Sequence, residues 1–384
     1  MPPLRITIVQ GAFLPVPPLL GGAVEKAWYA LGQEFAANGH TVVHVGRSHE
    51  QLPPQNKAGG VSYLRVRGYD TPASLWRLKL LDLVYSIRVR RVLPEADILV
   101  TNTFWLPWLE RRPSRGRLYV HVARYPKGQL KLYPERAVLQ TVSEPIRAAI
   151  LREVQNAPAR VRVIPYPLSP GYLVPLDEPK KVILHTGRIH PEKGVHLLVS
   201  AFLRMLDGGL RGWTLRIVGP WKTAQGGGGA DYRHQLQSEI SKAGGAIELC
   251  EPIFDEGTLV QQYREAAIFA YPSLAERGET FGLAALEAMA AGCVPVMSSL
   301  GCFADFIHDG ENGVMFNHRA NDPVAELSHA LLLLVNSPER RARLRQSAWA
   351  TARGYTLSKI AHELLDDFHS LHDPTPALAT SVPA

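Results

Sequence analysis

Two basic side chains lie in a glycine-bounded segment whose composition suits a phosphate-binding site. The segment 186–194 (TGRIHPEKG) falls between a predicted strand at 182–185 and a predicted helix at 195–206. Arg188 and Lys193 would place two positive charges beside the start of that helix, where free N–H groups and the helix dipole favour an anion. The segment therefore predicts a diphosphate cradle. A solvated surface loop is the alternative, because the chain lacks the GK[ST] ending of a Walker A loop and any GxGxxG.

A second polar cluster follows the predicted strand 268–271 and contains two carboxylates. Glu279 falls in a loop, and Glu287 falls on an apolar helix that opens near Gly282. Eight positions would separate them by roughly 12 Å on a helix, too far for a carboxylate pair acting on one bond. The spacing suits two ends of an extended polar ligand. We expect Glu287 to be buried with a partner, whereas Glu279 could be an ordinary exposed loop residue. Amides that could hold an anion between them are those of Phe281, Gly282 and Leu283.

Two features of the first half could also approach a ligand. Gly21 and Gly22 open a predicted helix at 24–37, and glycines there allow close backbone approach. A plain loop explains them equally well. His121 lies at the end of a predicted strand, 118–122, where a lone histidine is more often a core residue than a catalyst.

Strands alternate with helices in both halves, which predicts an α/β fold with parallel sheets covered on both faces. Two such units indicate two facing, doubly wound Rossmann-like domains, with the ligand in the cleft between them at the carboxyl ends of the strands. The remaining predicted strands are 4–9, 41–45, 97–101, 137–141, 162–164, 215–218, 247–249, 294–297 and 313–316.

Composition indicates a protein of two domains with sizeable cores. The chain has 384 residues, 46% of them hydrophobic. Three cysteines without a CxxC pair exclude a disulfide scaffold and argue against a structural zinc site. The first residues resemble no signal peptide, and no run is long and apolar enough to span a membrane. We therefore expect a cytoplasmic protein, with peripheral attachment to the inner face of the membrane as an option.

Charge is divided unevenly along the chain. Residues 1–170 contain 23 Lys and Arg against 11 Asp and Glu, whereas the remainder contains 19 against 24. A basic half suggests an anionic partner such as a membrane surface, a phosphate-bearing acceptor or nucleic acid, and a solvated basic surface is the alternative.

The order of the motifs resembles the retaining nucleotide-sugar glycosyltransferases of family 4. GGxxE occurs at 21–25, GRxxPEKG at 187–194 and ExFGx₄EAMA at 279–290. The resemblance covers about residues 4–370 and implies the GT-B architecture of two Rossmann domains. Two shorter segments are also similar to the family, VSE at 142–144 and DGENG at 309–313.

Carried over by motif, the resemblance assigns Arg188 and Lys193 to the donor diphosphate. It assigns Glu287 to the ribose hydroxyls, Glu279 to hydroxyls of the transferred sugar, and His121 to the reacting centre. Glu279, His121, Arg188 and Lys193 would be the catalytic residues. No cofactor is implied, and we expect no metal because the chain has no D-x-D pair. Residues implied to line the phosphate and sugar site are Gly22, Phe281, Gly282 and Leu283.

The function implied is transfer of a sugar from a UDP-, GDP- or ADP-linked donor, with retention by front-face attack. The acceptor would be a hydroxyl of a glycan, a lipid-linked molecule or a small molecule, in surface polysaccharide or glycoconjugate biosynthesis. Two alternatives stay open at this point. One is a nucleotide-sugar epimerase or hydrolase of the same fold, and the other is a non-catalytic nucleotide-binding module.

The expected domains are an acceptor-side domain at 1–170 and a donor-binding domain at 171–355. A C-terminal helix at 356–372 would return to the first domain, and 373–384 would be a disordered tail. The boundary is placed where five prolines interrupt the segment 165–179. The glycine run 226–229 predicts a mobile loop without a function.

One helix of the first half could contact a membrane. Residues 75–93 are apolar nearly all round yet contain five Lys or Arg, and an arginine run follows at 111–117. Together they could dock on an anionic membrane. The alternative is a helix packed on the first sheet with its basic tips in water. Nucleic acid is not expected, because no recognition motif accompanies the charge.

Overall fold

The computed structural model describes residues 2–72, 74–155, 157, 160–173 and 175–372, so the predicted tail at 373–384 lies outside the described residues. Its contacts divide the chain into two compact units. The first comprises the described parts of Met1–Val142, Ile146–Pro167 and Leu357–Ala384, and the second comprises Ser143–Pro145 and Leu168–Thr356. Each unit is described by itself below.

The first unit contains an eight-stranded sheet in which one strand is antiparallel. Its strands are β1 (Arg5–Val9), β2 (Thr41–Arg47), β3 (Gln55–Ala58), β4 (Val61–Val66), β5 (Ile98–Thr101), β6 (Arg117–His121), β7 (Val138–Thr141) and β8 (Val161–Val163). They lie in the order β3-β4-β2-β1-β5-β6-β7-β8, with only β3 antiparallel to its neighbour. The carboxyl ends of β1, β5 and β6 therefore meet at one edge.

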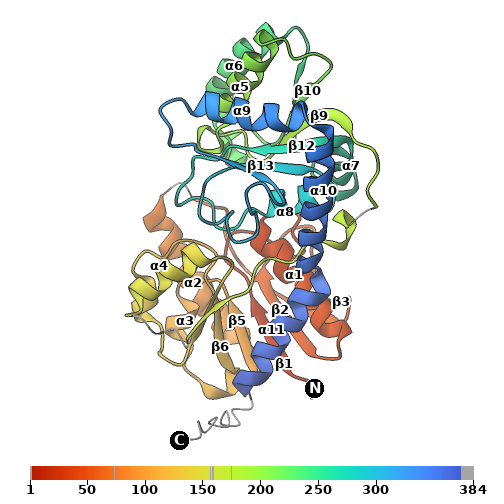
Figure 1. The fold of residues 1–384 in the computed structure, drawn as a ribbon. Coiled ribbons are helices and arrows are strands. Elements are labelled where there is room, and N and C mark those ends of the chain that lie inside the picture. The colour runs from red at the N-terminus through yellow and green to blue at the C-terminus, as the bar shows by residue number, and fades with distance from the viewer. Residues whose placement is uncertain (1, 73, 156, 158–159, 174, 373–384) are drawn as a thin grey trace, which may run out of the picture. The chain divides into compact units, whose positions relative to one another are not determined.

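Helices cover this first sheet, and the last helix of the chain is one of them (Figure 1). Phe368 of that helix packs edge-on against Phe35 and Tyr119, with ring centroids 5.8 and 4.9 Å apart. Asp367 accepts a hydrogen bond from the Tyr119 hydroxyl at 2.9 Å and pairs with Arg162 at 2.8 Å. The C-terminal helix thus completes the core of the N-terminal unit. The helices are α1 (Ala23–Ala37), α2 (Leu75–Val92), α3 (Leu106–Leu109), α4 (Glu144–Glu153) and α11 (Leu357–His372).

The hairpin formed by β3 and β4 is absent from the sequence-based prediction. Gly59 and Gly60 connect its strands, both with positive φ, as a two-residue hairpin turn requires. β3 reads QNKA and is exposed throughout, so it lacks the alternating apolar pattern that predicts a strand. An edge strand of this kind is held by its backbone pairing with β4.

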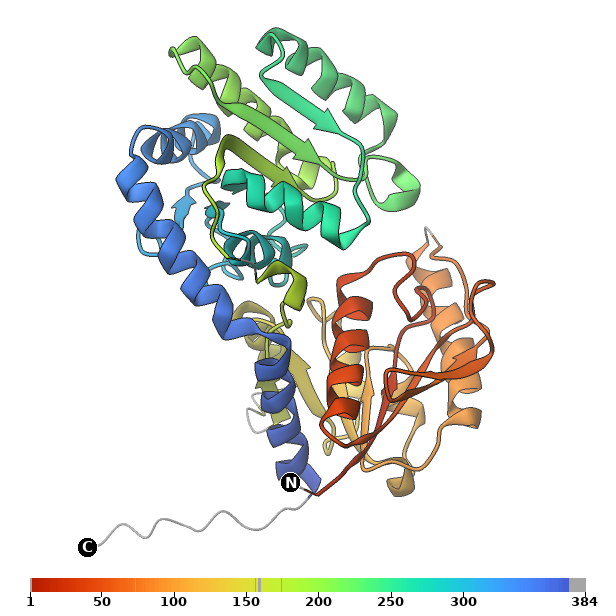
Figure 2. The ribbon, with the colours of Figure 1, turned by 90° about the vertical axis from the view of Figure 1, so that its right-hand side faces the viewer.

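The second unit contains a six-stranded, wholly parallel sheet. Its strands are β9 (Lys180–Thr186), β10 (Thr214–Val218), β11 (Ile247–Cys250), β12 (Ala266–Tyr271), β13 (Val294–Ser298) and β14 (Val314–Phe316), in the order β11-β10-β9-β12-β13-β14. All six residues of β12 (AAIFAY) are buried, as expected for a central strand covered on both faces (Figure 2). The helices are α5 (Val195–Asp207), α6 (Gly229–Ile240), α7 (Glu256–Glu265), α8 (Leu283–Ala290), α9 (Pro323–Val335) and α10 (Pro338–Ala352).

The predicted α/β class with two doubly wound units is confirmed. Most strand boundaries agree with the prediction within one or two residues, because each predicted strand is a short apolar run that ends in a polar or glycine-containing loop. Among the described residues, none of the helices combines the length and the hydrophobicity needed to cross a bilayer.

Candidate functional site

The loop after β9 has a conformation that only glycine allows at its end. A 3₁₀ turn, Pro191–Lys193, leads into α5, and Gly194 between them adopts a left-handed conformation with φ of 67°. A Cβ atom at Gly194 would lie 2.0 Å from the carbonyl oxygen of Pro272, which follows β12. Because β9 and β12 are neighbours in the sheet, this close approach brings the basic loop against the segment that carries Glu279.

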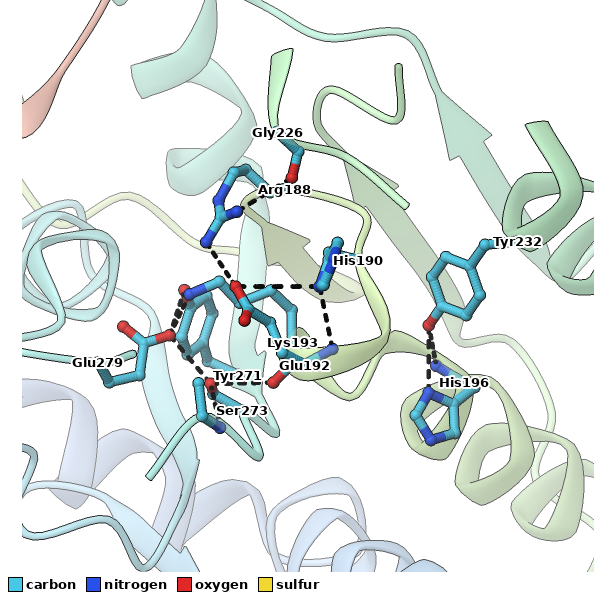
Figure 3. Close-up of polar contacts among 11 residues, drawn as sticks. Arg188, His190, Glu192, Lys193, His196, Gly226, Tyr232, Tyr271, Ser273 and Glu279 are labelled. Carbon is cyan, nitrogen blue, oxygen red and sulfur yellow. Dashed lines mark hydrogen bonds and ion pairs between the residues drawn. The ribbon is translucent and has the colours of Figure 1, made fainter. Parts of the chain in front are cut away.

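Lys193 and Glu279 form an ion pair that is almost completely buried. Lys193 is 5% exposed and Glu279 is 8% exposed, and the Lys193 ammonium contacts Oε1 of Glu279. The same oxygen accepts hydrogen bonds from the Tyr271 hydroxyl at 3.0 Å and from Ser273 Oγ at 2.9 Å. Figure 3 shows the other carboxylate oxygen pointing away from these three donors. Removing one member of such a pair leaves an uncompensated buried charge, which costs about 3–5 kcal/mol.

Arg188 is held at the half-exposed rim of the same loop. Its guanidinium pairs with Glu192 at 2.6 Å and donates to the carbonyl of Gly226 at 3.0 Å (Figure 3). The glycine run 226–229, predicted as a loop without a function, is thus tied to a predicted site residue. The backbone N–H of Gly228 also donates to the carbonyl of Ile189 at 2.8 Å. Glycine composition alone gave no signal for these contacts.

The start of α8 presents backbone N–H groups near Glu279. Gly282 is the N-cap residue with φ of 100°, and it supplies no capping side chain. A Cβ atom there would lie 2.7 Å from the ring of Phe303, so the packing requires glycine. Phe281 before it is buried and Leu283 begins the helix. The unsatisfied N–H groups of a first helical turn are a general binding site for anions.

Glu287 is connected to β9 through a second set of side-chain hydrogen bonds. The hydroxyl of Tyr263 lies 3.4 Å from Glu287 Oε2 and 2.5 Å from Thr186 Oγ1. Burial raises the pKa of Tyr263 well above its usual value, which keeps the phenol protonated. The expected burial of the two glutamates is wrong: Glu279 is buried, whereas Glu287 is half-buried. Glu279 can be buried because Lys193 compensates its charge.

His185, which the sequence analysis missed, lies at the centre of this region. Burial lowers its pKa to about 4, so the imidazole is neutral at physiological pH. Nδ1 donates to the carbonyl of Ala270 at 2.9 Å, and the ring stacks on Tyr271 with centroids 5.4 Å apart. Nε2 has no hydrogen-bond partner within the described part of the chain. The sequence signal that could have identified His185 is a single histidine within an apolar strand.

The remaining predicted residues, Gly22 and His121, belong to the first unit. Gly22 caps α1 with φ of 99°, and a Cβ atom there would lie 2.2 Å from the carboxylate of Glu25. Burial raises the pKa of Glu25 and lowers that of His121 to about 4. His121 Nδ1 lies 2.5 Å from Gln140 Oε1, and its Nε2 lies 3.1 Å from the Tyr166 hydroxyl. Both ring nitrogens are therefore engaged.

The structure thus gathers most of the predicted residues at one edge of the second sheet, around the ends of β9 and β12. Within the described ranges, no group of three or more His, Cys, Asp or Glu side chains is arranged to hold a metal ion. The residues gathered there are Arg188, Lys193, Glu279, Phe281, Gly282, Leu283 and Glu287.

Comparison with known proteins finds similarity to enzymes named for sugar transfer. The model of the family "Glycosyl transferases group 1" matches residues 174–350. The D-inositol 3-phosphate glycosyltransferase of Stackebrandtia nassauensis is 30% identical over 91% of this chain and 68% of its own length. The enzyme of that name from Actinosynnema mirum is 30% identical over 56% of this chain, and the match spans about half of the relative (53%).

Solved structures share the fold at low sequence identity. Sucrose-phosphate synthase from Thermosynechococcus elongatus has a TM-score of 0.75 at 19% identity, covering 96% of this chain and 99% of that one. HepE from Anabaena, solved with UDP and glucose, has a TM-score of 0.69 at 17% identity, covering 96% and 100%. An α,α-trehalose-phosphate synthase from Burkholderia xenovorans has a TM-score of 0.72 at 16% identity, covering 95% and 100%.

Proposed function

Because this chain belongs to the group 1 (family 4) retaining glycosyltransferases, we propose that it transfers the sugar of a UDP-sugar to a hydroxyl acceptor. The observation that carries the proposal is the buried pair of Lys193 and Glu279 beside Arg188 and the start of α8. This arrangement offers two cations and the first-turn backbone N–H groups of α8 at one edge of a sheet. It suits an anionic diphosphate with a polar sugar attached.

The cations of the site match the charge that develops during transfer. Breaking the bond between the sugar C1 and the donor phosphate oxygen leaves negative charge on the departing diphosphate. Arg188, Lys193 and the first-turn amides of α8 would stabilise that charge without rearranging, an effect worth several kcal/mol. Lys193 has three N–H donors, so contact with Glu279 leaves others for a phosphate oxygen.

The two glutamates would bind the two ends of the donor. One Glu279 oxygen points away from Lys193, Tyr271 and Ser273 (Figure 3). This oxygen would accept a hydrogen bond from a hydroxyl of the transferred sugar. Glu287, whose carboxylate lies beside the Tyr263 hydroxyl, would accept hydrogen bonds from the ribose hydroxyls. Both glutamates would then act as positioned acceptors, which explains why they need not lie close enough to share one bond.

Retention requires the new bond to form on the face from which the diphosphate leaves. In the reaction we propose, the acceptor oxygen bonds to C1 while the bond to UDP breaks. The acceptor proton passes to the departing phosphate oxygen. No protein base is then needed, which agrees with a His121 that burial makes a weak base, with a pKa of about 4, and whose two nitrogens are already engaged.

The nucleotide and the acceptor are the finer parts of the proposal. The complex of HepE with UDP and glucose supports UDP as the nucleotide. The relatives named for D-inositol 3-phosphate, together with a first half of net charge +12, support an acceptor that carries a phosphate. A role in polysaccharide or glycoconjugate synthesis is the corresponding pathway proposal, and it rests on the class of reaction alone.

Incubation with a panel of labelled UDP-, GDP- and ADP-sugars, with and without D-inositol 3-phosphate, tests the proposal. We expect transfer of label to the acceptor from a UDP-sugar, and a raised melting temperature with UDP alone. Free sugar formed equally without acceptor would indicate a hydrolase, and a changed sugar on the nucleotide would indicate an epimerase. Failure of all three nucleotides to raise the melting temperature would refute the donor site.

A further inference from the structure

Helix α2 of the first unit places large apolar side chains on the side that faces away from its sheet. Asp82, Tyr85, Ser86 and Val89 form its buried side. On the opposite side Trp76 is 71% exposed, Leu80 is 43% exposed and Ile87 is 41% exposed. Spacings of four and seven place these three on one helical face, here called the α2 outer face. In Figure 2, α2 is the orange helix at the outer edge of its unit.

A second apolar element adjoins this helix. The indole N–H of Trp105 donates to the carbonyl of Lys79 at 2.8 Å, which fixes the segment before α3 against α2. The ring of Trp105 contacts that of Trp108 with centroids 6.0 Å apart, and Trp108 is 44% exposed. Single exposed apolar residues are ordinary on protein surfaces. An aligned helical face that adjoins a further exposed tryptophan indicates an interaction surface.

Positive charge borders the α2 outer face. Arg77, Lys79, Arg90 and Arg91 are exposed on α2, and Arg88 is half-buried. The single acidic residue of the helix, Asp82, is buried and accepts the backbone N–H groups of Phe104 and Trp105 at 3.0 and 3.1 Å. Its charge is thus turned inward. An apolar face bordered by cations, with no exposed acid on the helix, is the pattern of a helix that lies in a membrane interface.

We propose that the α2 outer face docks on an anionic lipid bilayer, with the helix parallel to the membrane and its tryptophan at headgroup level. This goes beyond the proposed sugar transfer and does not depend on it. Charge complementarity selects this occupant: a second copy of the chain in a symmetric contact would bring the same cations against one another. Nucleic acid would leave the apolar face uncovered.

Vesicle flotation of the full chain tests the proposal. We expect flotation with phosphatidylcholine vesicles containing about 30% phosphatidylglycerol and little with phosphatidylcholine alone, because anionic headgroups supply the attraction. The variant Trp76→Gln/Leu80→Gln/Ile87→Gln keeps helix-forming residues and should bind at least about tenfold more weakly. The variant Arg77→Gln/Arg91→Gln should bind about 25-fold more weakly at low salt, since each surface cation contributes about fivefold.

Lys181→Gln/Arg343→Gln is the matched control, because it removes two exposed cations from the second unit. It should float like the unchanged protein. Circular dichroism and melting curves establish that every variant is folded. No flotation of the unchanged protein at low salt, or equal flotation of the apolar triple variant, would overturn the proposal. So would sedimentation showing that the α2 outer face instead mediates self-association.

Discussion

The carboxyl edges of the two sheets differ in how their polar groups are satisfied. In the second unit, Lys193, Tyr271 and Ser273 all converge on one oxygen of Glu279. In the first unit, the residues Gln10 and Asn102 come directly after the neighbouring strands β1 and β5. Their side-chain oxygens are buried and have no hydrogen-bond partner in the described ranges.

This difference suggests different tasks for the two edges. The second unit compensates its charges within the protein, so the groups that meet a charged ligand are fixed before it binds. The first unit leaves neutral oxygens unpaired, and a buried unpaired oxygen implies that something else supplies its hydrogen bond. Water, or a hydroxyl of the proposed acceptor, would do so. The predictions below separate the proposed donor edge, where the buried charges of Lys193 and Glu279 are paired, from the proposed acceptor edge, where two neutral oxygens are unpaired in the described ranges.

Replacing Lys193 should have the largest effect. Lys193→Met removes a cation from the diphosphate and leaves Glu279 buried without its ion-pair partner. We expect kcat/KM to fall by about 10³-fold or more and the unfolding free energy to fall by about 3–5 kcal/mol. Steady-state kinetics and urea unfolding measure the two effects. Lys181→Met, which changes an exposed lysine of the same strand region, should alter neither.

The double variant Lys193→Met/Glu279→Gln separates stability from activity. Neutralising both partners removes the uncompensated charge, so much of the lost stability should return. Activity should not return, because the cation is still missing. Recovery of sugar transfer in the double variant would show that Lys193 serves the fold alone.

Acid should destabilise both units through their buried histidines. His121 and His185 have pKa values near 4 in the folded protein, because burial disfavours their charged forms. Above about pH 6.5 both states are neutral; between pH 6.5 and 4 the unfolded state binds a proton that the folded state excludes. Each histidine should therefore cost about 2 kcal/mol of stability between pH 7 and 5. In urea unfolding, His185→Leu should lose about 2 kcal/mol less stability between pH 7 and 5 than the unchanged protein does. An unchanged loss would contradict the low pKa assigned to His185.

The sequence predicted elements well where one local pattern decides the structure. The run AAIFAY of β12 is apolar throughout and could hardly be anything but a buried strand or helix segment. The exposed strand QNKA of β3 has no such pattern, because backbone pairing with β4 holds it in place. Gly282 was correctly placed at the start of a helix, since the apolar run follows it directly.

The contacts within the candidate site could not be predicted in the same way. Lys193 and Glu279 are 86 positions apart, and they meet because β9 and β12 are neighbours in a sheet whose strand order the sequence does not state. Burial of Glu279 follows from that pairing. The contact of Arg188 with Gly226 likewise depends on where the loop after β10 folds.

The tight approach of the basic loop to Pro272 gives a prediction about stability alone. Gly194→Ala forces a left-handed alanine and a clash with a backbone carbonyl. Gly209→Ala meets the same backbone requirement, with φ of 92°, but nothing lies within 4 Å of the added Cβ. We expect Gly209→Ala to cost about 1 kcal/mol and Gly194→Ala about 3 kcal/mol. Equal losses in urea unfolding would show that the contact with Pro272 is easily relieved.

The smallest effect should come from the proposed acceptor edge of the first unit. Asn102→Ala removes a side-chain oxygen that has no partner in the described chain, so stability should change little. If that oxygen binds a hydroxyl of the acceptor, its loss should raise the acceptor KM about tenfold and leave the affinity for UDP unchanged. An equal loss of affinity for UDP would instead assign Asn102 to the donor site.

The central claim is that the second unit binds a diphosphate through the basic loop after β9. Calorimetric titration with UDP tests this claim directly. Arg188 is half-exposed, so Arg188→Gln should stay folded while losing one phosphate contact. We predict that UDP binds the unchanged protein and the control Arg343→Gln equally, and binds Arg188→Gln at least about tenfold more weakly. The same UDP affinity in all three proteins would contradict the account.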